Sequence, residues 1–220
     1  MYWIRLDGAA ARRVSLVGMV KTVIFDLGGV IVPFDFGPAF QRMEAWSGLG
    51  RDEIRARLMA DGLSMRFERG EVSAEEFRAE LNRRLGAAAS QADFVEMWLS
   101  IFTPGKTLIA ESLVASLAAR YRVLLLSNTT STHFDWLLAN TPHLRHMHEL
   151  VLSYAVGAAK PQPEIYAAAL GKARCEPGEC FFADDVLAYV EGARAAGIDA
   201  VQFTGEAQLR RDLAARGIEA

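Results

Sequence analysis

The hydrophobic pattern divides the chain into two kinds of segment. Val23-Ile24-Phe25 opens the first kind, in which consecutive residues are apolar, as in a strand buried on both faces of a parallel sheet. Similar runs predict strands at residues 122–126, 150–153, 179–183 and 200–203. Segments with helical period separate them, such as residues 163–172 and 186–196. This alternation predicts right-handed βαβ units and therefore an α/β fold with a doubly wound parallel sheet.

Residues 34–102 show helical periodicity alone. Apolar residues recur at intervals of three and four in four groups: Phe40, Met43, Ala45 and Trp46; Ile54, Leu58 and Met59; Phe77, Leu81 and Leu85; and Phe94, Met97, Trp98 and Ile101. Ser73 and Glu76 form a capping box before the third group. Because this block directly follows the first strand, we expect an all-helical cap domain over the carboxyl edge of the sheet.

The remaining boundaries follow from these two blocks. Residues 20–33 and 103–220 form the expected core, in which Thr103 and Pro104 predict the N-cap and first turn of a helix that ends at Arg120. Residues 1–19 form an N-terminal extension with no convincing secretory signal. Met19 stands just before the first strand, so residues 1–18 need not belong to the native protein, and we expect them to add nothing to the site.

Composition narrows the class of partner. The 220 residues are 51% hydrophobic and carry a net charge of −3 with no basic block, which argues against nucleic acid as the main partner. No apolar run is long enough to span a membrane. Cys175 and Cys180 match no zinc motif and are expected to be reduced thiols, so the compartment is expected to be cytoplasmic. The expected partner is a small molecule, and the sequence leaves the oligomeric state open.

Four polar clusters lie at or just beyond the ends of predicted strands. They are Asp26 with Gly28-Gly29, Ser127-Asn128, Lys160-Pro161 and Asp184-Asp185. Each cluster taken alone also fits a turn, a helix cap or a solvated side chain. The adjacent acids Asp184 and Asp185 are the most informative cluster. Neighbouring like charges cost free energy unless a cation compensates them, so this pair indicates a metal ion more than a helix cap. Together, carboxylates, a hydroxyl and one ammonium suit phosphoryl chemistry with Mg²⁺, which takes oxygen ligands.

In this order, the four clusters resemble the four motifs of the haloacid dehalogenase (HAD) superfamily. The helical block resembles that family's cap, and residues 67–73 (FERGEVS) read like its cap sequences. The resemblance extends from about Val20 to the C-terminus. It implies a Rossmann-like core with an inserted cap, and hydrolysis of small phosphorylated metabolites, including sugar phosphates.

The resemblance also implies a role for each motif. Asp26 would be the nucleophile, attacking phosphorus to give a phosphoaspartate that water then hydrolyses. Ser127 and the amide groups of Asn128 and Gly29 would bind the phosphoryl oxygens. Lys160 would offset the negative charge gathered between Asp26 and the phosphate.

The expected metal ligands come from the first and last motifs. Asp26, Asp185 and the Gly28 carbonyl would bind Mg²⁺, and Asp184 would hold a metal-bound water or Lys160. Gly28 is also a departure from the family pattern, because its phosphatases usually carry an aspartate there as general acid and base. A related branch with a small residue at this position includes bacterial sugar-1-phosphate phosphatases.

The missing acid predicts a preference for leaving groups that tolerate negative charge, unless a cap residue supplies the proton; Asp35 is the nearest in sequence.

A second departure is Tyr189, where many relatives have asparagine. Cap residues would set the substrate, and the candidates are Asp35, Trp46, Arg66, Phe67 and Arg69.

Two alternatives to a phosphatase stay open at this point. A 2-haloacid dehalogenase would use Asp26 on carbon without a metal, but Asp184 and Asp185 would then crowd negative charge into the site. A non-catalytic domain that kept a phosphate cradle is suggested only by Gly28.

Overall fold

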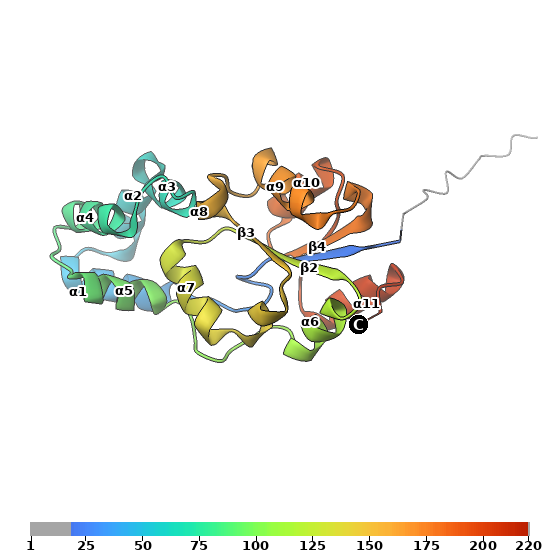
Figure 1. Cartoon of the computed structure of the whole chain (residues 1–220). Coiled ribbons are helices and arrows are strands. Elements are labelled where there is room, and N and C mark those ends of the chain that lie inside the picture. The colour runs from blue at the N-terminus through green and yellow to red at the C-terminus, as the bar shows by residue number, and fades with distance from the viewer. Residues whose placement is uncertain (1–18, 220) are drawn as a thin grey trace, which may run out of the picture.

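A computed structural model describes residues 19–219 as a sheet-based core with a helical cap at one end (Figure 1). The sheet has five parallel strands in the order β3-β2-β1-β4-β5. They are β1 (Thr22–Phe25), β2 (Arg122–Ser127), β3 (Glu149–Leu152), β4 (Cys180–Asp184) and β5 (Asp199–Gln202). Each predicted strand is within about one residue of an observed one, which confirms the α/β fold.

Helices cover both faces of the sheet because alternate strand residues point to opposite faces and both sets are apolar. Val23 and Phe25 belong to one hydrophobic cluster, whereas Ile24 belongs to the other. In Figure 1, α9 and α10 lie on one side of the sheet, and α6 and α11 lie on the other. The core helices are α6 (Glu111–Ala118), α7 (Ser131–Asn140), α8 (Ser153–Val156), α9 (Pro163–Ala173), α10 (Leu187–Ala195) and α11 (Glu206–Ala215).

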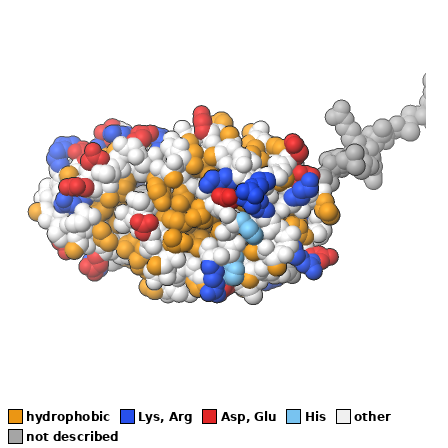
Figure 2. All heavy atoms as spheres, viewed as in Figure 1, with side chains coloured by type: hydrophobic (Ala, Val, Ile, Leu, Met, Phe, Trp, Pro, Cys, Tyr) orange, Lys and Arg blue, Asp and Glu red, His pale blue; other side chains and the backbone are white. Residues whose placement is uncertain are grey.

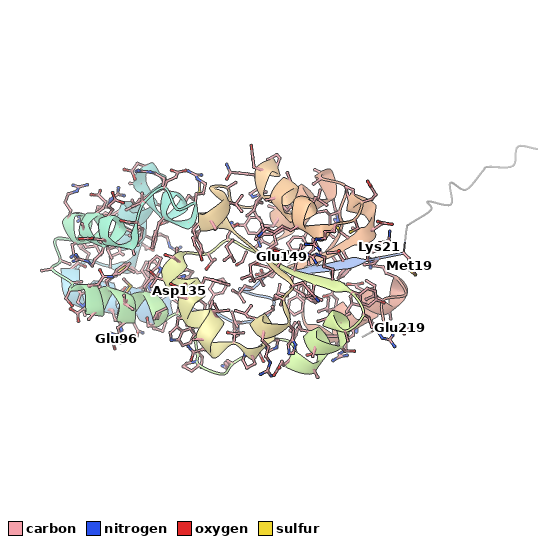
Figure 3. The ribbon with its side chains drawn as sticks, viewed as in Figure 1. Met19, Lys21, Glu96, Asp135, Glu149 and Glu219 are labelled. Atoms are coloured by element: carbon pink, nitrogen blue, oxygen red, sulfur yellow. The ribbon has the colours of Figure 1, made fainter. Side chains whose placement is uncertain are left out.

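The strands run toward the cap. Met19 and Lys21 mark the amino end of β1, which is the end farther from the cap helices (Figure 3). The carboxyl edge of the sheet therefore faces the cap, and β1 ends in the middle of that edge. Residues 1–18 of the expected N-terminal extension lie outside the described part of the chain.

The cap has its own hydrophobic cluster. Its helices are α1 (Gly37–Ser47), α2 (Arg51–Met59), α3 (Leu63–Glu68), α4 (Ala74–Leu85) and α5 (Gln91–Leu99). Phe67 stacks on Phe77 with ring centroids 4.4 Å apart, and the predicted capping box of Ser73 and Glu76 is present at the start of α4. Phe34 and Phe102 form an antiparallel bridge, so the two connections to the core run side by side. The expected domain boundaries beside these residues stay a prediction.

The prediction that a helix begins at Thr103 and Pro104 is wrong. Pro104 and Gly105 instead occupy a turn closed by a hydrogen bond from the Lys106 N–H to the Thr103 carbonyl, with Gly105 at φ +72°. Proline before a residue with positive φ is typical of a type II turn, and proline also begins helices, so the same residues predicted the wrong element. The core helix begins only at Glu111.

Three further features bear on the expectations from sequence. The Cys175 and Cys180 sulfur atoms are 3.5 Å apart and both thiols are free, as predicted. Within residues 19–219, no helix combines the length and the apolar character needed to cross a bilayer. On the face in Figure 2, hydrophobic side chains gather near the middle of the view, where the cap meets the core in Figure 1.

His133 on α7 holds the cap against the core. Its ring stacks on Trp98, near the end of α5, with centroids 5.0 Å apart and planes 8° from parallel. Its Nε2 lies 2.9 Å from the Trp98 carbonyl oxygen, which can only accept, so Nε2 donates. Burial lowers the pKa of His133 to about 4, although the bond to Trp98 acts in the opposite direction.

This histidine makes stability depend on pH. An unfolded histidine titrates near ~6.5, so below that pH the unfolded chain takes up a proton that the folded chain refuses until about 4. We expect the free energy of unfolding to fall by about 2 kcal/mol from about pH 7 to about pH 5. Denaturant unfolding at each pH measures this. His133→Gln is the control, because it can still donate to Trp98 without titrating; an equal fall in that variant would contradict the assignment.

Candidate active site

Three strands bring polar side chains to one point at the carboxyl edge. Asp26 follows β1, Ser127 ends β2 and Asp184 ends β4, and all three are buried. Lys160 reaches the same point from the loop between α8 and α9 and is 3% exposed. Asp185, next to Asp184, is partly exposed. The four sequence clusters therefore converge as expected from neighbouring parallel strands.

The Lys160 ammonium lies between two buried carboxylates. Its Nζ is 2.9 Å from Asp26 Oδ1 and 2.6 Å from Asp184 Oδ2. Burial alone would lower the pKa of Lys160, but the two carboxylates outweigh it and hold the pKa above its usual value. Asp26 shares that one cation with Asp184, so burial dominates there and raises the pKa of Asp26 to about 7.

Backbone groups orient these side chains. The Leu27 N–H donates to Asp26 Oδ1 at 2.7 Å, and the Val186 N–H donates to Asp184 Oδ1 at 2.9 Å. The Asn128 side chain bonds the Lys160 main chain twice, accepting from its N–H at 2.8 Å and donating to its carbonyl at 3.1 Å. The Asn128 side-chain amide is therefore engaged in placing the Lys160 main chain.

The acids of the site can hold a divalent cation. Asp26, Asp184 and Asp185 each offer a carboxylate oxygen, and these atoms lie within 4.8 Å of one another. Against three carboxylates the site has one ammonium, that of Lys160, among the described residues. Burial and the neighbouring Asp184 raise the pKa of Asp185, so its charge is not fully compensated by the protein. Oxygen donors with excess negative charge fit Mg²⁺.

Gly28 and Gly29 lack a side chain for different structural reasons. Gly29 has φ +77°, and a Cβ there would lie about 2.4 Å from the carboxyl group of Asp185. Its N–H donates to the Val32 carbonyl at 2.9 Å, within the turn after β1, instead of being free for a phosphoryl oxygen as expected. A Cβ on Gly28 would come within 3.0 Å of the Phe34 ring. A phenyl ring therefore occupies the neighbourhood in which the family usually keeps its acid.

A cavity of about 560 Å³ lies above these groups, between core and cap. Asp26, Ser127, Asn128 and Asp185 contribute to its lining, and Tyr189 joins them with its ring 5.1 Å from the Lys160 ammonium. The cap side is formed mainly by aromatic and methionine side chains, with Arg55, Ser64 and Glu68 as its polar members.

None of the five cap residues proposed from sequence as substrate contacts lines this cavity. Phe67 is buried in the cap cluster, the Asp35 carboxylate accepts from the Gly37 N–H, and Arg69 pairs with Glu71. Trp46 and Arg66 also lie outside the lining. The neighbouring Phe34, Phe36 and Glu68 line it instead. The sequence does not show in which direction each cap side chain points. On a helix, a step of one residue turns the side chain by about 100°.

Comparison with known proteins agrees with this geometry. A model of haloacid dehalogenase-like hydrolases matches residues 20–197, which is most of the chain. The chain belongs to this family. It is 30% identical to a D-ribitol-5-phosphate phosphatase of Bacteroides thetaiotaomicron, over 89% of this chain and 97% of that protein. It is 29% identical to a phosphatase of Mycobacterium tuberculosis, over 90% and 95%.

Solved structures of the family share the whole architecture. A HAD family enzyme from Bacteroides thetaiotaomicron has a TM-score of 0.77 at 27% identity, covering 86% of this chain and 95% of that one. The same enzyme in complex with magnesium and inorganic phosphate has a TM-score of 0.74 at 28% identity, covering 84% and 95%. An L-2-haloacid dehalogenase from Xanthobacter autotrophicus, at 20% identity and a TM-score of 0.59 over 91% and 85%, shares the fold.

The close approach of Gly29 to Asp185 generates a prediction. Gly29→Ala adds a methyl group where the Asp185 carboxyl lies, so we expect Mg²⁺ affinity to fall by about 10 to 100-fold. Gly48→Ala is the matched control, since Gly48 also has positive φ, +68°, but nothing lies within 4 Å of the added carbon. Both variants should lose about 1 kcal/mol of stability through backbone strain. Calorimetric Mg²⁺ titration separates them, and unchanged affinity in Gly29→Ala would remove Asp185 from the metal site.

Proposed function

We propose that this HAD-like hydrolase is a Mg²⁺-dependent phosphatase that acts on small phosphorylated metabolites through a phosphoaspartate on Asp26. The observation that carries the proposal is the buried carboxylate of Asp26, 2.9 Å from the Lys160 ammonium, at the base of a cavity beneath the cap. A nucleophile, one cation and excess oxygen ligands together supply the positioning and charge compensation that phosphoryl transfer requires.

In the proposed reaction, an oxygen of the Asp26 carboxylate attacks phosphorus and the bond from phosphorus to the ester oxygen breaks. The departing alcohol takes up a proton, and water then attacks phosphorus, which releases inorganic phosphate and regenerates Asp26. The Ser127 hydroxyl and the Asn128 main-chain N–H would bind phosphoryl oxygens. Lys160 would remain charged and offset the charge of the phosphate beside Asp26.

The metal would be held by Asp26, Asp185 and the Gly28 carbonyl. Asp184 is engaged by Lys160 and by the Val186 N–H, which suits a residue that positions the lysine and a metal-bound water. When bound, Mg²⁺ supplies compensation for the negative charge that accumulates on the phosphoryl group.

The two alternatives have less support. A 2-haloacid dehalogenase would leave Asp26, Asp184 and Asp185 with Lys160 alone as their cation, and the dehalogenase of known structure is similar only in fold. A non-catalytic domain would not require the nucleophile and the lysine to be in direct contact. The relative named for ribitol 5-phosphate makes that ester the polyol phosphate to include among the test substrates. A cytoplasmic location and the absence of a nucleic-acid partner are part of this proposal.

The proposal predicts that Asp26→Asn abolishes turnover, because an amide is a far poorer nucleophile of nearly the same shape. We expect Mg²⁺-dependent phosphate release from 4-nitrophenyl phosphate to fall below about a thousandth of wild type. Circular dichroism and unfolding should show an intact fold. Asp35→Asn, an exposed acid outside the cavity, should keep full activity. Near-normal activity of Asp26→Asn, or chloride release from 2-chloropropionate by wild type without metal, would contradict the proposal.

A further inference from the structure

The leaving oxygen of an alkyl phosphate needs a proton, and the usual source is absent from this chain. Gly28 has no side chain, and the Phe34 ring packs beside it. Asp35, the nearest acid in sequence, accepts a hydrogen bond from the Gly37 N–H at 2.8 Å at the exposed start of α1. Because Asp35 does not line the cavity, it is poorly placed to reach a substrate bound there.

Glu68 is the one acid that the cap contributes to the cavity lining within residues 19–219. It is the last residue of α3, and it lines the same cavity as Asp26 and Asp185. Within the described chain its carboxyl group makes no hydrogen bond and no ion pair, so it is available to a ligand. Ser64 and Arg55, the other polar cap residues in the lining, do not release a proton near neutral pH.

The core fixes the position of this part of the cap. The Ser153 hydroxyl, fully buried at the start of α8, donates to the Glu68 carbonyl at 2.6 Å. The same oxygen accepts from the Thr129 N–H at 2.9 Å, in the loop that follows Ser127. Two residues further on, a Cβ on Gly70 would lie 2.3 Å from the Tyr154 carbonyl oxygen, so the two backbones touch. Glu68 is thus placed relative to the phosphate-binding loop.

We propose that Glu68 is the general acid of the reaction, protonating the ester oxygen as its bond to phosphorus breaks. This rests on the proposed phosphatase function. The carboxylate left on Glu68 then takes a proton from the water that attacks the phosphoaspartate, so the proton count balances over one cycle. Burial raises the pKa of Glu68, although Lys160 acts against this, and the acid form is therefore present at higher pH than for an exposed glutamate.

The test compares two leaving groups in Glu68→Gln. A primary alkyl ester, cyclohexylmethyl phosphate, needs the proton, whereas 4-nitrophenyl phosphate releases a stable anion. We expect kcat/KM for the alkyl ester to fall by about 10² to 10⁴-fold and that for the aryl ester by less than about threefold. The ratio kcat/KM reports steps up to phosphoaspartate formation, so the later role of Glu68 does not confuse it. The alkaline limb of the pH profile for the alkyl ester should also disappear.

Glu71→Gln is the matched control, because Glu71 is an exposed glutamate of the same segment that pairs with Arg69 and does not line the cavity. It should leave both substrates unaffected. Equal losses for both esters in Glu68→Gln would show a structural role, and an unchanged alkyl rate would also overturn the proposal. If wild type releases phosphate from neither ester with Mg²⁺, the phosphatase function itself fails.

A separate observation concerns the carbon part of the substrate. Five large apolar side chains that line the cavity are at least 38% exposed: Phe34, Phe36, Met59, Met65 and Val186. Met59 is the most exposed of the five, at 60%. Exposed apolar residues are common singly, but a group around one concave site indicates ligand binding.

We infer that the cavity accepts phosphate esters whose carbon part is apolar in preference to polyols. An apolar group would cover these side chains, whereas the hydroxyls of a polyol would lose water against them and would meet polar side chains on the cap side at Arg55, Ser64 and Glu68 alone among the lining residues. This second inference also rests on the proposed function, but it does not depend on which residue supplies the proton.

Cyclohexylmethyl phosphate and ribitol 5-phosphate test it, since both are primary alkyl esters and both need a protonated leaving group. We expect kcat/KM to be at least about tenfold higher for the cyclohexylmethyl ester, mainly through KM. Met65→Gln should reduce this preference, and Leu138→Gln, an exposed leucine outside the cavity, should not. Equal or faster turnover of ribitol 5-phosphate would overturn the inference, and no turnover of either ester would instead contradict the phosphatase.

Discussion

The contact of the Lys160 ammonium with Asp26 and Asp184 is the interaction on which the site depends. A buried ammonium without partners would lose its proton, and two buried carboxylates without a cation would take one up. Each group therefore favours the charged form of the others, and the contact with Lys160 limits how far burial raises the pKa of Asp26. The cost of burying the cluster is offset by the backbone bonds to Asp26 and Asp184 and by the Asn128 side chain that holds the lysine main chain.

The excess of negative charge links this cluster to the metal. Because the described site offers one ammonium to three carboxylates, a divalent cation stabilises what the protein leaves uncompensated. Gly29 belongs to the same arrangement, since only a residue without a side chain leaves room for Asp185 over the turn after β1. The charge balance and the shape of the backbone thus favour the same cofactor.

The cap contributes side chains to the cavity, and its contacts with the core fix their position. Trp98 and His133 join it to α7, and Ser153 joins the end of α3 to the loop after β2. These contacts hold the apolar side chains of the cap and the Glu68 carboxyl group over the charged cluster of the core. A low-dielectric wall strengthens the electrostatic interactions beneath it, so in the proposed reaction the cap would act on the charged groups of the site as well as on the substrate.

The sequence by itself determined the sheet, its strands and the four motifs, because strand burial and turn chemistry are local and leave periodic signals. Convergence of Asp26, Ser127 and Asp184 followed from parallel strands alone. Tertiary structure decided which cap residues face the site: Phe67 and Glu68 are adjacent in sequence, yet one packs inside the cap and the other lines the cavity. It also decided that residues 103–106 form a turn instead of the start of a helix. Facing and loop paths depend on contacts between distant segments, such as Ser153 with Glu68, and no local pattern encodes these.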